Sequence, residues 1–186
     1  MSRGLSLLMT ADAIGGVWQY SLDLAAALGP LGVTTILVTL GPRASAAQRS
    51  EAAAAGVTLM ESGLPIDWLC DGPEPIHAAG EAIAAIAKAR KVDVVQLNMP
   101  TLGARPRFAM PVVAVMHGCI ATWWDAAHGM TLAPEFRWQR TATHQALMAA
   151  DAVVAPSATH AAEVARHYGL VHAPLAIHNG RSPLLL

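Results

Sequence analysis

The chain has 186 residues, of which 54% are hydrophobic and 13% are charged, and its formal net charge at pH 7 is −1. This length fits one domain with a single core, and the charged fraction is well below the roughly 25% of an ordinary globular protein. The composition argues against nucleic acid as a partner, because a phosphate-binding surface needs clustered Lys and Arg side chains, and the sequence has no such cluster.

The first half of the chain alternates short apolar runs with longer, alanine-rich segments of helical periodicity. This alternation is typical of β-α-β units and a parallel sheet. We expect strands over residues 5–9, 33–40, 56–60 and 92–97, and helices over residues 17–28, 45–55 and 76–90.

The second half continues the same alternation. We expect strands over 111–117, 151–156 and 174–180, and helices over 134–149 and 158–169. The whole pattern predicts one α/β domain with a doubly wound, mainly parallel, Rossmann-like sheet and right-handed crossovers.

We expect no closing helix at the end of the sequence, because RSPLLL, with its three final leucines, follows an expected strand. We therefore expect a Rossmann-like domain over residues 1–180 and the truncated start of an interdomain segment over 181–186. A docking segment is the alternative interpretation of this apolar tail.

Features that would indicate export or membrane insertion are weak. Cys70 and Cys119 form no Cys-x-x-Cys pair, so a reduced, cytoplasmic location is expected. The N-terminal residues lack the cleavage site of a signal peptide. The uncharged stretch 24–42 is long enough to span a membrane, but glycines and a proline interrupt it, which favours a helix followed by a strand. Peripheral membrane contact remains open, without a polybasic amphipathic helix to support it.

Gly15 and Gly16 lie between the first expected strand and the first expected helix. Ligands of open α/β sheets bind at the carboxyl ends of the strands, and a turn without Cβ atoms lets a phosphate or sugar approach the helix N-terminus. A tight turn with close packing of the helix on the sheet is the alternative. The sequence has neither Gly-x-Gly-x-x-Gly nor a Gly-Lys-Ser/Thr motif here, which disfavours a nicotinamide or P-loop enzyme.

Residues 116–129, MHGCIATWWDAAHG, follow the expected fifth strand. His117 comes at the carboxyl end of that strand, so we favour a functional role in which it donates or accepts a hydrogen bond with a sugar. Trp123 and Trp124 could present an apolar face to a sugar or acceptor. For the tryptophans, however, anchoring in the core is the favoured interpretation.

Other reactive side chains give weaker signals. His160 and His167 lie on one expected helix without a third ligand at metal spacing, so a solvated face is expected and no metal site is predicted. Cys119 is interpreted as a small hydrophobic residue rather than a nucleophile. No Gly-x-Ser-x-Gly motif of esterases occurs.

Four separated segments together resemble the N-terminal half of a family 4 glycosyltransferase of the GT-B type. They are GGVWQYSLDLAAAL, HGCIATWWDA, RWQRTATHQALMAADAVVAPSATHAAEVARHYG and IHNGR. The resemblance covers nearly the whole chain, and the segments occur in the right order on the expected elements.

The resemblance implies two Rossmann-like domains that face each other across a cleft. Such enzymes use a nucleotide-sugar donor as substrate, retain the anomeric configuration and need no metal or other cofactor, and their N-terminal domain mostly binds the sugar acceptor. It also implies that His117 approaches the donor sugar as the catalytic candidate. The substrate-binding candidates are Gly15 and Gly16 near the donor diphosphate, Asn98, Thr122 and Trp123, and Asn179 and Gly180 at the crossover into the second domain.

The chain departs from this family because the C-terminal domain, which holds the nucleotide, is absent from the 186 residues. Leaving-group stabilisation would come mainly from that domain, so we expect little or no catalysis unless a donor-binding domain is supplied in cis or in trans. The alternative is a non-catalytic binding or assembly subunit with the same fold. An oxidoreductase on this fold has little support.

Overall fold

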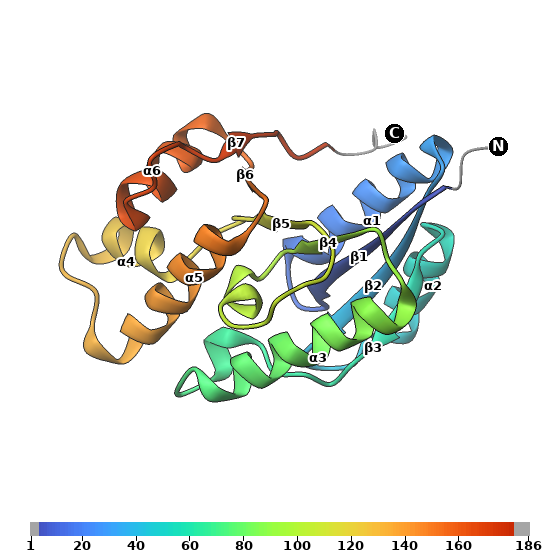
Figure 1. The fold of residues 1–186 in the computed structure, drawn as a ribbon, viewed down its shortest axis with the longest axis horizontal. Coiled ribbons are helices and arrows are strands. Elements are labelled where there is room, and N and C mark those ends of the chain that lie inside the picture. Colours follow the sequence, from blue (N-terminus) through green and yellow to red (C-terminus); the bar gives the residue numbers. More distant parts are fainter. Residues whose placement is uncertain (1–3, 181–186) are drawn as a thin grey trace.

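The computed structural model describes residues 4–180, which form a parallel sheet flanked by helices (Figure 1). The strands are β1 (Leu5–Asp12), β2 (Val33–Leu40), β3 (Thr58–Glu61), β4 (Val94–Leu97), β5 (Val112–Val115), β6 (Ala152–Ala155) and β7 (Leu175–Ala176). The helices are α1 (Gly16–Leu28), α2 (Ala46–Ala54), α3 (Glu74–Arg90), α4 (Ile120–His128), α5 (Arg137–Ala149) and α6 (Ala158–Tyr168). Four short 3-10 turns join them: η1 (Gly29–Leu31), η2 (Asp67–Leu69), η3 (Pro100–Gly103) and η4 (Pro134–Phe136).

The strand order is β3-β2-β1-β4-β5-β6-β7, and every pairing is parallel. The predicted fold class is therefore confirmed. The order reverses between β1 and β4, and in sheets of this type that point opens a crevice at the carboxyl ends of the strands. The interdomain segment expected over 181–186 lies outside the described residues.

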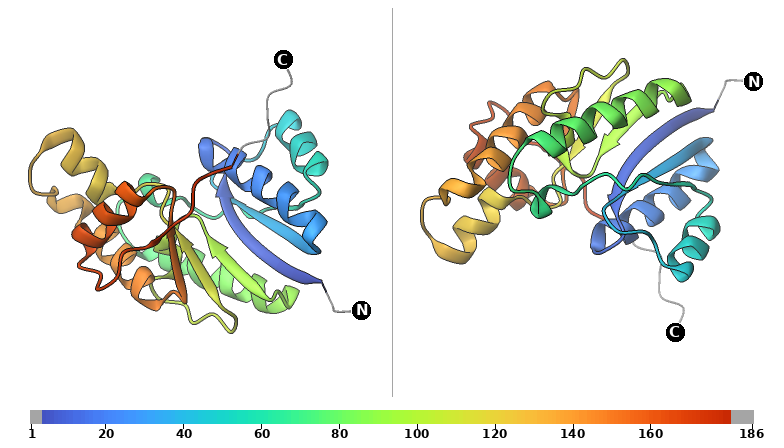
Figure 2. Two further views of the ribbon diagram at one scale, coloured as in Figure 1. Left: turned by 90° about the horizontal axis from the view of Figure 1, so that it is seen from above. Right: turned by 90° about the horizontal axis from the view of Figure 1, so that it is seen from below.

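Alternate side chains of β1 enter two different cores, which places helices on both faces of the sheet (Figure 2). Leu8 packs in a cluster with Ile83 of α3, whereas Met9 packs in a cluster with Trp18 of α1. Successive side chains of a strand point to opposite faces of the sheet, and this alternation produces the division. Because both faces are covered, the strands are continuous apolar runs, which explains the low charge content.

The structure contains one helix, α4, that was not expected from the sequence. Helix α4 begins after Cys119 and ends at His128, and its C-cap residue Gly129 has the left-handed conformation, with a φ of 59°. Its apolar residues Ile120, Trp123, Trp124 and Ala127 do have the spacing of one helix face, but Ala121 is the one residue of α4 that is buried, so this face does not pack in the core. The helix expected over 134–149 is also shorter, because residues 134–136 form the 3-10 turn η4.

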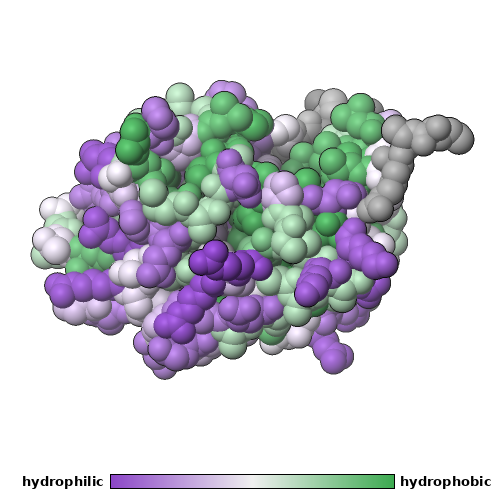
Figure 3. All heavy atoms as spheres, in the orientation of Figure 1, coloured by the Kyte–Doolittle hydropathy of each residue, from purple (hydrophilic) through white to green (hydrophobic). Residues whose placement is uncertain are grey.

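The last described strand leaves an apolar edge. β7 pairs with β6 alone in this sheet, and Val171, Leu175 and Ile177 are exposed beside or within it. Figure 3 shows hydrophobic residues along the upper edge of the molecule, where Figure 1 places β7. Exposed apolar edges of this kind are usually covered by another protein segment. No helix in the described part is both long and apolar enough to cross a membrane.

Gly80 allows α3 to pack directly on η3, because a Cβ atom there would overlap the carbonyl group of Leu102. We expect Gly80→Ala to lower the free energy of unfolding by about 1–3 kcal/mol, although Ala is the better helix former. Urea denaturation measures the change. Ala85→Gly, at an exposed position of the same helix, is the control for helix propensity alone. It should lower the free energy of unfolding by about 1 kcal/mol. Unchanged or increased stability of Gly80→Ala would show that α3 can move away from η3.

Candidate functional site

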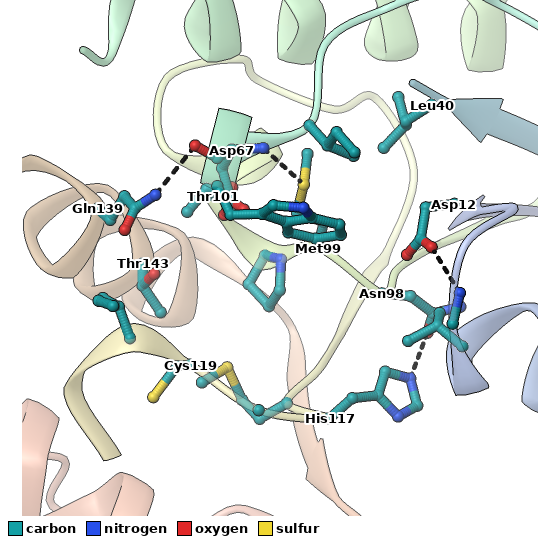
Figure 4. Close-up of a pocket in the computed structure, with 18 of the residues that line it drawn as sticks. Asp12, Leu40, Asp67, Asn98, Met99, Thr101, His117, Cys119, Gln139 and Thr143 are labelled. Carbon is teal, nitrogen blue, oxygen red and sulfur yellow. Dashed lines mark hydrogen bonds between the residues drawn. The ribbon is translucent and has the colours of Figure 1, made fainter. Parts of the chain in front are cut away.

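A pocket of about 630 Å³ opens at the carboxyl ends of the central strands (Figure 4). Asp12 ends β1, Asn98 follows β4 directly, and His117 comes two residues after β5. All three line the pocket, together with Gly15. The reversal of strand order thus brings residues about 100 positions apart to one wall.

Asn98 is fixed by its hydrogen bonds, and it determines the tautomer of His117. The Asn98 Nδ2 donates to the carbonyl oxygen of Thr10 at 2.9 Å, so Oδ1 must be the acceptor atom of the amide. This Oδ1 accepts from Gln96 Nε2 at 3.0 Å and lies 3.1 Å from His117 Nε2. His117 Nε2 therefore carries the proton, and Nδ1 is left to accept a hydrogen bond.

The surroundings of His117 keep its ring neutral. Burial is the main cause that lowers its pKa to about 4, the charge of His160 lowers it further, and Asp12 partly opposes the shift. The ring also packs edge-on against Tyr20, with 4.4 Å between the ring centroids. At neutral pH, His117 is therefore an uncharged hydrogen-bonding group in a fixed orientation.

The turn at Gly15 and Gly16 does not need glycine for the packing of this chain. A Cβ atom on either residue would meet nothing within 4 Å, and neither residue has a positive φ. The alternative of close helix-to-sheet packing is therefore wrong for both residues. Asp12 Oδ1 already accepts hydrogen bonds from the N–H groups of Ile14, at 2.8 Å, and Gly15, at 3.1 Å. An incoming anion would compete with Asp12 or use N–H groups further into α1.

The opposite side of the pocket is polar in a way that sequence reasoning missed. Figure 4 shows Asp67, Thr101, Gln139 and Thr143 on this side, across from His117. They come from η2, η3 and α5. The only sequence signal was that Asp67 lies in the segment after β3, whose carboxyl end faces the same edge of the sheet as those of β1 and β4.

The candidates from sequence divide into two groups. Gly15, Asn98, His117 and Trp123 line the main pocket, and Trp123 is 57% exposed, so core anchoring is wrong for this tryptophan. The remaining candidates lie elsewhere: Gly16 is just beyond the lining, Thr122 faces a second depression between α4 and α6, and Asn179 and Gly180 are exposed after β7.

Within residues 4–180, one group of side chains has metal-ligand spacing: Asp125, Glu163 and His167. The sequence interpretation gave His160 and His167 no further ligand; it is wrong on this point for His167, because α4 contributes Asp125 beside it, whereas His160 is not in the group. Arg166 forms salt bridges with Asp125 and Glu163. These carboxylates are thus already paired with a cation, and the group is an ordinary ion-pair cluster at the surface.

The model of glycosyltransferase family 4 matches residues 14–182 of the chain. Among solved structures, the chain is similar to Anabaena Alr3699/HepE in complex with UDP and glucose, with a TM-score of 0.62, 14% identity, and coverage of 96% of this chain and 45% of that protein. A glycosyltransferase from Rickettsia africae gives a TM-score of 0.56 and 18% identity, covering 90% of this chain and 41% of that protein. No curated protein matches in sequence.

A putative UDP-N-acetylglucosamine 2-epimerase from Listeria monocytogenes is also similar in fold, with a TM-score of 0.54, 12% identity, and coverage of 90% of this chain and 42% of that protein. The chain spans less than half the length of each of these three proteins. At these identities the likeness establishes the GT-B type of Rossmann-like fold, and activity has to be argued from the site.

Proposed function

The chain belongs to glycosyltransferase family 4, and from this premise we propose that it is the acceptor-binding half of a retaining glycosyltransferase. The enzyme would move a sugar from a nucleotide-sugar donor to an acceptor hydroxyl, without a bound metal. A donor-binding domain, joined to the chain or associated with it, would complete the cleft. The chain covers less than half of the length of the similar solved structures, which supports this division of roles.

The observation that carries the proposal is the open space above Gly15 beside a neutral, oriented His117. A glycine that the chain's own packing does not require is accounted for by a ligand that approaches the backbone there. The free Nδ1 of His117 can accept a hydrogen bond from a hydroxyl of the donor sugar. Both features lie on the wall where α/β proteins bind ligands.

In the proposed reaction, the acceptor oxygen bonds to the anomeric carbon as the bond from that carbon to the diphosphate breaks. The proton of the acceptor hydroxyl leaves with the diphosphate. The leaving group gains negative charge, and the described residues that line the pocket include no Lys or Arg to stabilise it. We therefore assign that stabilisation to the donor-binding domain.

Calorimetric titration with a panel of nucleotide sugars tests the division of roles. The chain alone should bind these donors weakly, and binding and transfer should appear when a donor-binding domain of the family is added. Tight donor binding by the chain alone would contradict the assignment as the acceptor half. Donor binding without any transfer in the presence of the added domain would favour a non-catalytic binding subunit.

Gly15→Leu tests the role of the turn. The fold should tolerate the new side chain, with a loss of about 1 kcal/mol or less in unfolding free energy, because the position is open and Gly15 is only the N-cap of α1. Transfer in the completed enzyme should fall by about tenfold or more, since the side chain would occupy the space left for substrate.

Gly29→Leu is the matched control, because Gly29 also has open space around its Cβ position and lies at the other end of α1. It should leave transfer unchanged. Equal transfer rates for Gly15→Leu and the parent protein would contradict a substrate position next to this turn.

A further inference from the structure

Asp67 is a carboxylate held rigidly at the side of the pocket that faces His117 (Figure 4). Thr101 Oγ1 donates a hydrogen bond to Asp67 Oδ2 at 2.8 Å, and Gln139 Nε2 donates to the Asp67 carbonyl oxygen at 2.9 Å. Side chain and backbone are thus tied to two different elements, η3 and α5. A group fixed in this way can position a ligand without first losing conformational freedom.

The charges around the pocket have one sign. The titratable side chains that line it are two carboxylates, Asp12 and Asp67, a thiol and a neutral histidine, and none of the described lining residues is Lys or Arg. The Asp12 carboxylate already accepts two N–H groups of the glycine turn. Among the described residues, Asp67 has the Thr101 hydroxyl and the N–H of Trp68 as partners but no cation; burial raises its pKa, and these hydrogen bonds to the charged form oppose that shift. An anionic group placed beside Asp67 would meet its carboxylate without compensating positive charge among the described lining residues.

Most of the remaining wall is apolar. Buried apolar side chains form the floor of the pocket: Leu40, Ile66, Met99 and Met116. Three large apolar side chains around it are exposed: Ile14 at 59%, Trp68 at 53% and Trp123 at 57%. Two tryptophans beside one pocket offer flat surfaces for a ring.

These observations lead to a substrate class, which rests on the proposed function. We propose that the acceptor is an uncharged alcohol with an apolar ring body, and that one of its hydroxyls donates a hydrogen bond to Asp67. The ring packs on the apolar wall, and the carboxylate provides the charge-assisted hydrogen bond. The same carboxylate excludes phosphorylated and other anionic acceptors.

The test compares two probes that share a ring and differ in charge, 2-naphthol and 2-naphthyl phosphate. Calorimetry with the chain at pH 7.5 should show that 2-naphthol binds about tenfold or more tightly than its phosphate ester. In Asp67→Asn, the affinity for the alcohol should fall and that for the ester should rise, so that their ratio shrinks by about threefold or more. Asp71→Asn removes the same charge at an exposed position nearby, outside the pocket, and should leave the ratio unchanged.

Three results would overturn the inference: equal or tighter binding of the ester, no binding of either probe, or the same ratio in Asp67→Asn and Asp71→Asn. Circular dichroism of both variants establishes that they remain folded. The result is independent of the test of function, because the probes bind without a donor. Failure of transfer in the completed enzyme would contradict the proposed function and leave the probe preference intact, whereas loss of the preference would overturn only the acceptor class.

Discussion

His117→Ala is expected to reduce kcat/KM for sugar transfer in the completed enzyme on the order of 100-fold. The neutral imidazole is held by Asn98 with Nδ1 available, so the hydrogen bond that we propose with the donor sugar would already be oriented before the reaction begins. Such a group contributes most when the sugar changes shape and charge in the transition state. The ratio of kcat/KM for the two proteins gives the lost transition-state stabilisation.

The effect of His117→Ala on stability should be smaller than its effect on transfer. The variant removes the edge contact with Tyr20 and one of two hydrogen bonds to Asn98 Oδ1, which together cost about 1–2 kcal/mol. His144→Ala, at an exposed position of α5, is the control and should change neither property. A His117→Ala enzyme as active as its parent would show that the ring has only a structural role.

The second large effect expected is a loss of stability in acid that depends on His117. Its pKa is about 4 in the folded chain and about 6.5 when unfolded, so below pH 6.5 the unfolded state takes up a proton that the folded state does not. Stability from this residue is complete above pH 6.5, decreases as the pH falls from 6.5 to 4, and is fully lost below pH 4. The parent should lose about 3 kcal/mol between pH 7 and pH 4 that His117→Gln retains.

Urea denaturation of the parent and His117→Gln at several pH values measures this difference. Gln keeps an amide that can donate to Asn98, so the variant should fold at neutral pH. His144→Gln, which removes an exposed histidine, should follow the parent curve. Parallel curves for the parent and His117→Gln would show that His117 becomes protonated in the folded chain near its ordinary pKa.

Most of the fold could be predicted because the determining signals are local. A period of two or of 3.6 and glycines at helix ends reveal strands and helices in a single pass along the chain. The helices α1, α3 and α6 begin and end within about two residues of the prediction. The exception is α4, a short helix that was missed although Ile120, Trp123, Trp124 and Ala127 have helical spacing; its apolar face stays largely outside the core, where only Ala121 is buried.

One wall of the site was also accessible from sequence. In a parallel sheet the carboxyl ends of all strands lie at the same edge, so Gly15, Asn98 and His117 could be expected to converge once the strands were placed. The positions of Asn179 and Gly180 could not be judged in this way. They follow the edge strand β7, away from the point where the strand order reverses.

The sequence by itself determined the α/β class, the parallel sheet and the residues at its carboxyl edge, because periodicity and strand ends are properties of neighbouring residues. The tertiary structure decided the other half of the pocket, since Gln139 reaches Asp67 across 72 positions from a different element. It also decided the protonation of His117, because burial and the orientation of Asn98 exist only in the packed chain. Packing likewise decided that a Cβ atom would meet open space at Gly15 and the Leu102 carbonyl at Gly80, which no local pattern records.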